Sequence, residues 1–251
     1  MTDLPIASNW CFHTGLASSG TSGLVKLLNG HPEALILREG LIWTYTDMLG
    51  EPKFRPTPAS HLINHEVMLE QAGFDEWPPE RLRAFFEGVR QMVAPRAVVF
   101  GDKATLYAQV IDDLQAVFPG CKLLHTVRET WDHVASIYEA QWWREQVMAK
   151  NGPLSEARLA VKAYQQQRWW ARKIAGHVRI VADAEKENAL IVRFEDLAER
   201  PRETMVDVLN FMGLDVVEYD WSVLETVHYA GRVERWQECN AIVELRERLE
   251  E

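Results

Sequence analysis

Apolar positions along this chain follow two patterns that alternate from one end to the other. Short uninterrupted apolar runs predict buried strands, which fall at residues 10–15, 33–39, 96–103, 121–129 and 189–197. Apolar residues at helical spacing predict amphipathic helices, which fall at residues 20–29, 60–74, 79–93, 104–118, 130–143, 155–184 and 201–214. The proline-rich segment 40–58 predicts a loop, and the charged tail predicts a peripheral helix at about 238–251.

Strands that alternate with helices predict an α/β fold, in which a central parallel sheet is flanked by helices. The chain has no repeat period and no low-complexity linker, so we interpret residues 1–251 as a single domain. Ligands of such sheets bind at the carboxyl ends of the strands. The candidate chemistry is therefore expected just after the predicted strands, near Thr14, Glu39, Gly101, Arg128 and Glu195.

Composition narrows the classes of function. The chain has 251 residues and a formal net charge of −10, which argues against binding to nucleic acid. No apolar run approaches the ~20 residues of a membrane helix, and the start lacks the features of a secretory signal. We therefore expect a cytoplasmic protein without a membrane span. Cys11, Cys121 and Cys239 lie far apart, which predicts neither a disulfide scaffold nor a metal site.

The stretch "FHTGLASSGTSGL", residues 12–24, resembles a phosphate-binding loop. Gly15 and Gly20 fit the frame G-x-x-x-x-G-K-[ST], but Thr21 stands where that frame has lysine. Backbone amides at a helix start bind an anion without any side-chain charge. A loop without lysine suits a group that carries less charge than a phosphoryl group, such as a sulfonate. The missing lysine argues against the alternative of a small-molecule kinase.

Two further strand ends carry groups that bind anions. Arg128 ends one predicted strand, and Ser136 follows it about two helical turns later. Lys103 ends another predicted strand. Because the carboxyl ends of parallel strands share one edge of the sheet, these side chains are expected close to the loop.

Together these stretches resemble the sulfotransferase family that uses 3′-phosphoadenosine-5′-phosphosulfate. Residues 19–22 match the core of the family loop P-[KR]-S-G-T-[TS], and "VRETWDHVASIY" resembles LRDPxxRxxSxY. "GDKATLY" resembles G-E-K-[ST]-P-x-Y, and "IVRFEDLAERPRETMVDVLNFMGL" resembles a family stretch of mainly structural value. "AGRVERWQ" is similar to a late G-R-W segment that closes over the nucleotide. The resemblance covers about residues 9–237 and implies a P-loop NTPase-like sulfotransferase fold.

The resemblance also implies roles for individual residues. The donor would be 3′-phosphoadenosine-5′-phosphosulfate, the product adenosine 3′,5′-bisphosphate, and no metal would be needed. The residues implied to bind this nucleotide are Ser18, Ser19, Gly20, Thr21, Ser22, Gly23, Arg128, Ser136, Arg235 and Trp236. Arg128 and Ser136 would hold the 3′-phosphate. Glu39 would accept the acceptor's proton, and Lys103 would stabilise developing charge.

One departure from the family pattern bears on activity. The loop position that the family fills with Lys or Arg is Ser18, and the preceding proline is Ala17. A charge-assisted hydrogen bond lost at a transition state costs a few kcal/mol. Either another cation replaces it, with Lys103 the first candidate and Lys26 the second, or the chain is a weak or inactive nucleotide-binding homologue.

Other choices stay open at the level of sequence. Glu39 is the first candidate for the base, but it can also be a strand-end carboxylate paired with Arg38. Four histidines are further candidates that we expect to be packed instead, namely His13, His61, His65 and His125. The tryptophan pairs 142–143 and 169–170 fit either a substrate platform or core packing. The acceptor can be a small molecule, a glycan or a peptide, and the oligomeric state is not encoded in these patterns.

Overall fold

The computed structural model describes residues 9–38, 78–105, 107, 111–183, 188–227, 229 and 232–250. Within these ranges five strands form one sheet in the order β2-β3-β1-β4-β5, and every pairing is parallel. The strands are β1 (Asn9–Gly15), β2 (Ala34–Arg38), β3 (Val99–Lys103), β4 (Lys122–Val127) and β5 (Ala189–Arg193). The parallel α/β architecture expected from the sequence is thus confirmed.

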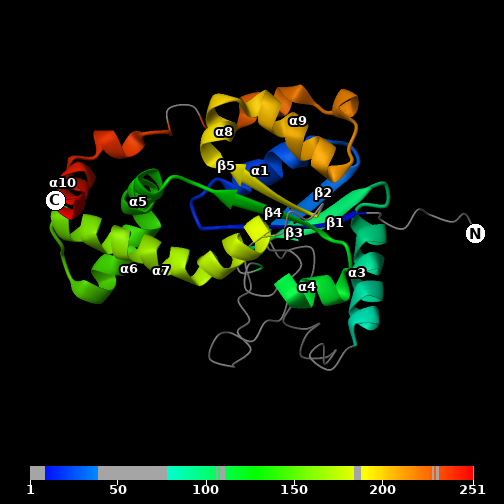
Figure 1. Cartoon of the computed structure of the whole chain (residues 1–251), viewed down its shortest axis with the longest axis horizontal. Coiled ribbons are helices and arrows are strands. Elements are labelled where there is room, and N and C mark those ends of the chain that lie inside the picture. Colours follow the sequence, from blue (N-terminus) through cyan, green and yellow to red (C-terminus); the bar gives the residue numbers. More distant parts are fainter. Residues whose placement is uncertain are drawn as a thin grey trace, which may run out of the picture.

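Helices cover both faces of the sheet and continue beyond its carboxyl end (Figure 1). The α-helices are α1 (Thr21–Leu28), α3 (Pro79–Val93), α4 (Ile111–Val117), α5 (Thr130–Glu139), α6 (Gln141–Asn151), α7 (Glu156–Asp183), α8 (Phe194–Glu199), α9 (Pro201–Met212) and α10 (Asn240–Glu250). Short 3₁₀ helices follow α9, namely η4 (Val216–Glu218), η5 (Trp221–Thr226) and η6 (Arg235–Glu238).

Side-chain alternation along the strands divides the core between the two faces. Trp10 and Phe12 of β1 pack with α3 and α4, whereas Cys11, between them, packs with α1, α8 and α9. This is the period-two alternation of a strand that is buried on both sides. A third apolar cluster joins α5, α6, α7 and α10, and the buried residues Ile242 and Leu245 hold the tail helix in it. The expected tail helix is therefore present.

Three elements differ from the sequence-based expectation. The run 189–197 is not one strand, because β5 ends at Arg193 and α8 begins at Phe194. Glu195 and Asp196 lie in the first turn of α8, where the helix dipole favours carboxylates. The expected helix 130–143 is divided at Ala140, whose φ and ψ of −66° and 110° are extended. The helix expected over 104–118 does not begin at 104, which is not helical, and α4 spans Ile111–Val117; residues 106 and 108–110 lie outside the described ranges. Residues 40–74 lie outside the described ranges.

Gly101 marks a close approach between β1 and β3. A Cβ atom there would lie 1.7 Å from the carbonyl oxygen of Cys11, its register partner, whereas a Cβ at Gly88 in α3 would meet nothing within 4 Å. We expect Gly101→Ala to lower the free energy of unfolding by at least about 2 kcal/mol, because β1 must shift. Gly88→Ala should raise it by about 0.5–1 kcal/mol through helix propensity. Urea unfolding monitored by circular dichroism measures both. Equal stabilities of the two variants would show that the β1–β3 contact tolerates a side chain.

Candidate functional site

A pocket of about 430 Å³ lies where β1 and β4 meet α1 at the carboxyl edge of the sheet. Its lining residues are Ser18, Gly20, Thr21, Ser22, Gly23, Lys26, Arg128, Ser136, Phe194, Thr226, Val227, Tyr229 and Arg232. Most of the residues that the sequence suggested for nucleotide binding are therefore brought together around one cavity. Its volume falls within the ~300–1,000 Å³ range of small-molecule sites.

The loop between β1 and α1 presents backbone amides to this pocket. Gly20 begins the turn into α1 with a φ of 91°, and no side chain caps the helix. Among the described residues, no backbone carbonyl accepts a hydrogen bond from the amides of Gly20, Thr21 or Ser22. Amides at a helix start that lack an internal acceptor are the donors that bind anions. The loop is thus built to receive an anionic group.

Ser19 plays a different part in the loop from its neighbours. Its side chain is buried and does not line the pocket. Its hydroxyl donates to the carbonyl of Leu16 at 2.7 Å and lies 3.4 Å from the carbonyl oxygen of Thr126. These contacts brace the loop against itself and against β4, so the geometry of Ser19 supports the shape of the loop.

Two side chains from the β4–α5 unit hold successive carbonyls of the loop. Arg128 donates through Nη1 to the carbonyl of Ser18 at 3.1 Å, and Nε2 of His133 lies 2.5 Å from the carbonyl oxygen of Ala17. Ser18 has a φ of 69°, a left-handed conformation that is costly for a residue with a Cβ atom. Holding these carbonyls on the β4–α5 side stabilises that conformation and leaves the following amides facing the pocket.

Arg128 is more constrained than a surface arginine. Its Nη2 donates to the carbonyl of Arg232 at 2.8 Å, and its guanidinium lies 4.1 Å above the ring of Phe194. Burial lowers the pKa of Arg128, and the carboxylates of Asp132 and Glu195 oppose that shift. Its Nε is buried and makes no hydrogen bond with the described part of the chain. The guanidinium therefore has a fixed position at the pocket wall.

The segment that begins at the last residue of η5 closes another side of the pocket. We call the described residues 226, 227, 229 and 232–238 the C-terminal strap. The hydroxyl of Tyr229 donates to the carbonyl of Gly20 at 3.3 Å, and Nζ of Lys26 donates to the carbonyl of Thr226 at 3.0 Å. A Cβ atom at Gly23 would lie 2.0 Å from the hydroxyl of Tyr229. Gly23 is thus required for close packing of the strap on α1.

Comparison with known proteins identifies the family of this chain. The model of a family described as "Sulfotransferase family" matches residues 11–218, which is most of the chain. The chain belongs to the sulfotransferase family.

Solved structures of this family share the fold. A sulfotransferase domain from the Synechococcus PCC 7002 olefin synthase is 16% identical with a TM-score of 0.59, and the match covers 99% of this chain and 98% of that one. A sulfotransferase domain from the curacin biosynthetic pathway is 17% identical with a TM-score of 0.53, over 88% and 79% of the two chains. At these identities the likeness shows the P-loop NTPase-like sulfotransferase fold.

Among curated proteins, this sulfotransferase chain is similar to nodulation protein NoeE of Sinorhizobium fredii (strain NBRC 101917 / NGR234). The two are 23% identical over 224 residues, which is 87% of this chain and 53% of NoeE. The chain spans about half the length of this relative.

Several pocket residues were not suggested by the sequence. Phe194 comes from the stretch that was expected to have mainly structural value, and Tyr229 and Arg232 come from the strap. Arg232 lies within "AGRVERWQ", so the similarity of that stretch to a nucleotide-covering segment was the available signal. Nothing in the local sequence indicated Phe194 or Tyr229, because they reach the pocket only through the packing of α8 and the strap on α1.

Two residues that the sequence suggested for nucleotide binding lie elsewhere in the strap. Arg235 forms an ion pair with Glu139 at 3.1 Å. The ring of Trp236 lies 4.3 Å from the guanidinium of Arg246 and packs in the cluster of α5, α7 and α10. Neither residue lines the pocket, and their contact with a nucleotide stays a prediction.

Of the two candidate catalytic residues, Lys103 lies within the described ranges and Glu39 does not. Lys103 ends β3, is buried beside its register partner His13, and is not among the pocket-lining residues. The pocket-lining cations are Lys26, Arg128 and Arg232. Glu39, together with His61 and His65, lies outside the described ranges, and its role as the base stays a prediction.

The two histidines of the sheet are packed between strands. His13 is fully buried, and its Nε2 lies 2.6 Å from the hydroxyl oxygen of Thr126. Burial, with Lys103 and His125 nearby, lowers the pKa of His13 to about 3. His125 is likewise buried.

In the described part of the chain, no group of three or more His, Cys, Asp or Glu residues is placed to hold a metal. No helix described here is long and apolar enough to cross a membrane.

His133 should make stability depend on pH. The family motif LRDPxxRxxSxY has its second arginine at this position, and burial lowers the pKa of His133 to about 4. The contribution of neutral, buried His133 to the free energy of unfolding is complete above the unfolded pKa of about 6.5. It is lost as pH falls toward 4, because the unfolded chain then binds a proton that the folded protein does not. At pH 5 we expect this residue alone to cost about 2 kcal/mol of folding free energy.

The variant His133→Gln tests this dependence, because its amide can still donate to the carbonyl of Ala17 but cannot titrate. We expect the variant to lose clearly less stability than the wild type between pH 7 and pH 5. Urea unfolding at each pH measures the difference. Parallel pH profiles of the two proteins would contradict the assignment of a neutral, buried His133.

Proposed function

We propose that this chain is a sulfotransferase that uses 3′-phosphoadenosine-5′-phosphosulfate as donor and transfers its sulfonate to a hydroxyl or amine of an acceptor. The observation that carries this proposal is one cavity lined both by residues 20–22, whose amides have no backbone acceptor within the described residues, and by Arg128, whose guanidinium is held in place by hydrogen bonds. Family membership supplies the reaction class, and this donor set matches a ligand with two anionic ends.

The donor fits the residues present. The loop amides, helped by the hydroxyls of Thr21 and Ser22, would bind its 5′-phosphosulfate. Arg128 and Ser136 would hold its 3′-phosphate, and Arg232 adds a third positive side chain at the wall. When bound, the donor supplies an activated sulfonate: the acceptor oxygen or nitrogen forms a bond to sulfur, and the bond from sulfur to the phosphate oxygen breaks. Adenosine 3′,5′-bisphosphate leaves with that electron pair.

The acceptor must lose a proton during this transfer. We assign its removal to Glu39, which directly follows Arg38, the last residue of β2 at the carboxyl edge of the sheet. Negative charge developing on the leaving phosphate calls for a cation. Lys103 was the first candidate from the sequence, and Lys26 is the lysine that lines the pocket. Since Lys26 extends from α1 beside the loop, both lysines are candidates for this cation.

A second function is favoured by the residue at position 18. Ser18 brings no charge to the loop position that the sulfotransferase pattern fills with Lys or Arg. A chain that kept the pocket and lost efficient transfer would bind the bisphosphate and sulfate nothing. Turnover, not binding, separates this nucleotide-binding homologue from the enzyme.

The acceptor is proposed only as a class. A small molecule, a glycan or a peptide with a free hydroxyl or amine fits the reaction. We expect segments 40–95 and 139–170 to contribute its wall, with the exposed Trp142 and Trp169 as candidate platforms. A cytoplasmic location agrees with the supply of the activated donor in the cell interior and stays a proposal.

The variant Arg128→Ala tests donor binding. We expect it to weaken binding of adenosine 3′,5′-bisphosphate by about 1.5–3 kcal/mol, the usual size of a lost hydrogen bond to a charged group. Arg200→Ala is the matched control, because Arg200 is exposed and forms an ion pair with Asp196 on the surface of α8. Isothermal titration with the bisphosphate measures both variants, and a parallel titration with ATP and Mg²⁺ separates a kinase. Equal affinities of the two variants would remove Arg128 from the nucleotide site, and preference for ATP would overturn the proposed donor.

Turnover of the donor tests the missing loop cation. If no other residue supplies the charge, Ser18→Lys should raise turnover on the order of tenfold or more. If Lys103 or Lys26 already supplies it, Ser18→Lys should change little, and the alanine variant of the responsible lysine should lose turnover on the order of 10²-fold. Double mutants with Ser18→Lys show whether the sites are coupled. Unchanged turnover in all single variants of an active protein would show that none of these positions carries the charge.

A further inference from the structure

Asp132 is a buried carboxylate that the proposed transfer does not use. It lies in the first turn of α5 and is 2% exposed. Its own amide donates to Oε2 of Glu129 at 2.8 Å, so its backbone is fixed at the start of the helix. The motif LRDPxxRxxSxY leaves this position open, and family resemblance therefore assigns Asp132 no role.

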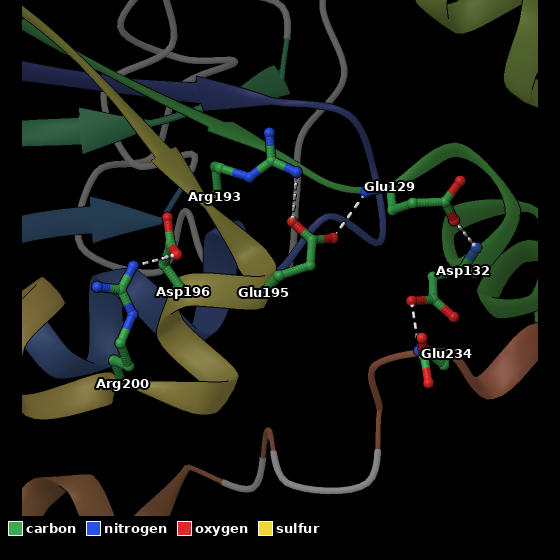
Figure 2. Close-up of polar contacts among 7 residues, drawn as sticks. All are labelled: Glu129, Asp132, Arg193, Glu195, Asp196, Arg200 and Glu234. Atoms are coloured by element: carbon green, nitrogen blue, oxygen red, sulfur yellow. Dashed lines mark hydrogen bonds and ion pairs between the residues drawn. The ribbon is translucent and has the colours of Figure 1, made fainter.

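The carboxylate of Asp132 bridges from α5 to the C-terminal strap (Figure 2). Its Oδ2 accepts from the amide of Glu234 at 2.7 Å, and its Oδ1 accepts from the amide of Trp236 at 3.3 Å. A buried carboxylate requires such donors, because burial without them is costly. The two backbone amides of the strap are thus the partners that make burial of Asp132 favourable.

Glu234 adopts a conformation that depends on this bridge. Its φ and ψ of 59° and 16° are left-handed, which is unfavourable for a residue with a Cβ atom. Its side chain is exposed. The hydrogen bond from its own amide to Asp132 therefore offsets the strain of the turn.

The turn at Glu234 lies two residues after the part of the strap that enters the pocket. The carbonyl of Arg232 accepts from Nη2 of Arg128, and the side chain of Arg232 lines the cavity. Arg128 and Asp132 are one helical turn apart in sequence, so a single corner of the fold holds the strap at two points. Release at Asp132 would remove one of the two links between this corner and the strap, and the hydrogen bond from Arg128 to the carbonyl of Arg232 would be the other.

We propose that Asp132 is a positioning residue of the donor site, which holds the amides of Glu234 and Trp236 and thereby keeps Arg232 at the pocket. This inference rests on the proposed function, because it names the residue that shapes the nucleotide-binding wall. The link continues to α8, where Oε1 of Glu195 accepts from the amide of Glu129 at 2.7 Å (Figure 2). Acidic side chains thus join α8, α5 and the strap in one row.

The variant Asp132→Asn keeps the shape of the side chain but turns one acceptor into a donor that faces a backbone amide. We expect its affinity for adenosine 3′,5′-bisphosphate to fall about tenfold, in keeping with the loss of a hydrogen bond to a charged group. Asp215→Asn is the matched control, because Asp215 is an exposed carboxylate that accepts from the amide of Val217 at 2.9 Å away from the pocket. Isothermal titration compares the two variants with the wild type.

A second substitution separates positioning from general loss of structure. In the Asp132→Asn background, Glu234→Gly should recover at least about threefold in affinity, because glycine adopts the left-handed turn without strain. Glu234→Ala removes the same carboxylate but keeps the Cβ atom, so it should recover nothing. Equal recovery by alanine and glycine would attribute the effect to the charge of Glu234 and would overturn the proposal.

Hydrogen exchange in the ligand-free protein measures the strap directly. Amides 234 and 236 should exchange about tenfold faster in Asp132→Asn than in Asp215→Asn. Unchanged bisphosphate affinity in Asp132→Asn would overturn the positioning role, whatever the exchange rates. A wild type that shows the expected exchange but binds no bisphosphate would instead contradict the proposed function, and the assignment to donor binding would fall with it.

Discussion

The guanidinium of Arg128 joins the two backbone segments on which the pocket depends. One of its nitrogens holds the carbonyl of Ser18 in the loop, and the other holds the carbonyl of Arg232 in the strap. Both segments contain a non-glycine residue with positive φ, so neither has its conformation fixed by local preference alone. Arg128, a charged donor at the end of β4, stabilises both conformations through these hydrogen bonds. Loop and strap are therefore parts of one site.

This arrangement is the one by which the proposed anion site would work without the lysine of a phosphate-binding loop. The loop offers backbone amides, whose direction is set by neighbours that hold the preceding carbonyls, including His133 at Ala17. Positive charge enters from the wall, through Arg128 and Arg232, instead of from the loop itself. In the proposed function, binding and transfer would therefore depend on different groups. The amides and the wall charges would favour the bound anion, whereas the transition state for sulfonate transfer would need a cation next to the sulfonate.

The buried carboxylate of Asp132, which acts electrostatically on Arg128, has a comparable role. It lies in the first turn of α5, where the helix dipole favours negative charge, and it opposes the effect of burial on the pKa of Arg128. The same side chain accepts from the strap. Electrostatic support of the arginine and placement of the strap thus come from one residue, so we expect changes there to affect donor binding more than the helical core.

The sequence by itself determined the order of strands and helices, the α/β class, and the residues of the loop and of the β4–α5 corner. It could do so because strand and helix periodicity, glycine spacing and strand-end cations are local signals. Tertiary structure decided the rest: that Phe194 starts a helix, that Lys26 lines the pocket while Lys103 is buried at the end of β3, and that Tyr229 and Arg232 complete the wall. These placements arise from contacts between segments far apart in the chain, which no local pattern specifies.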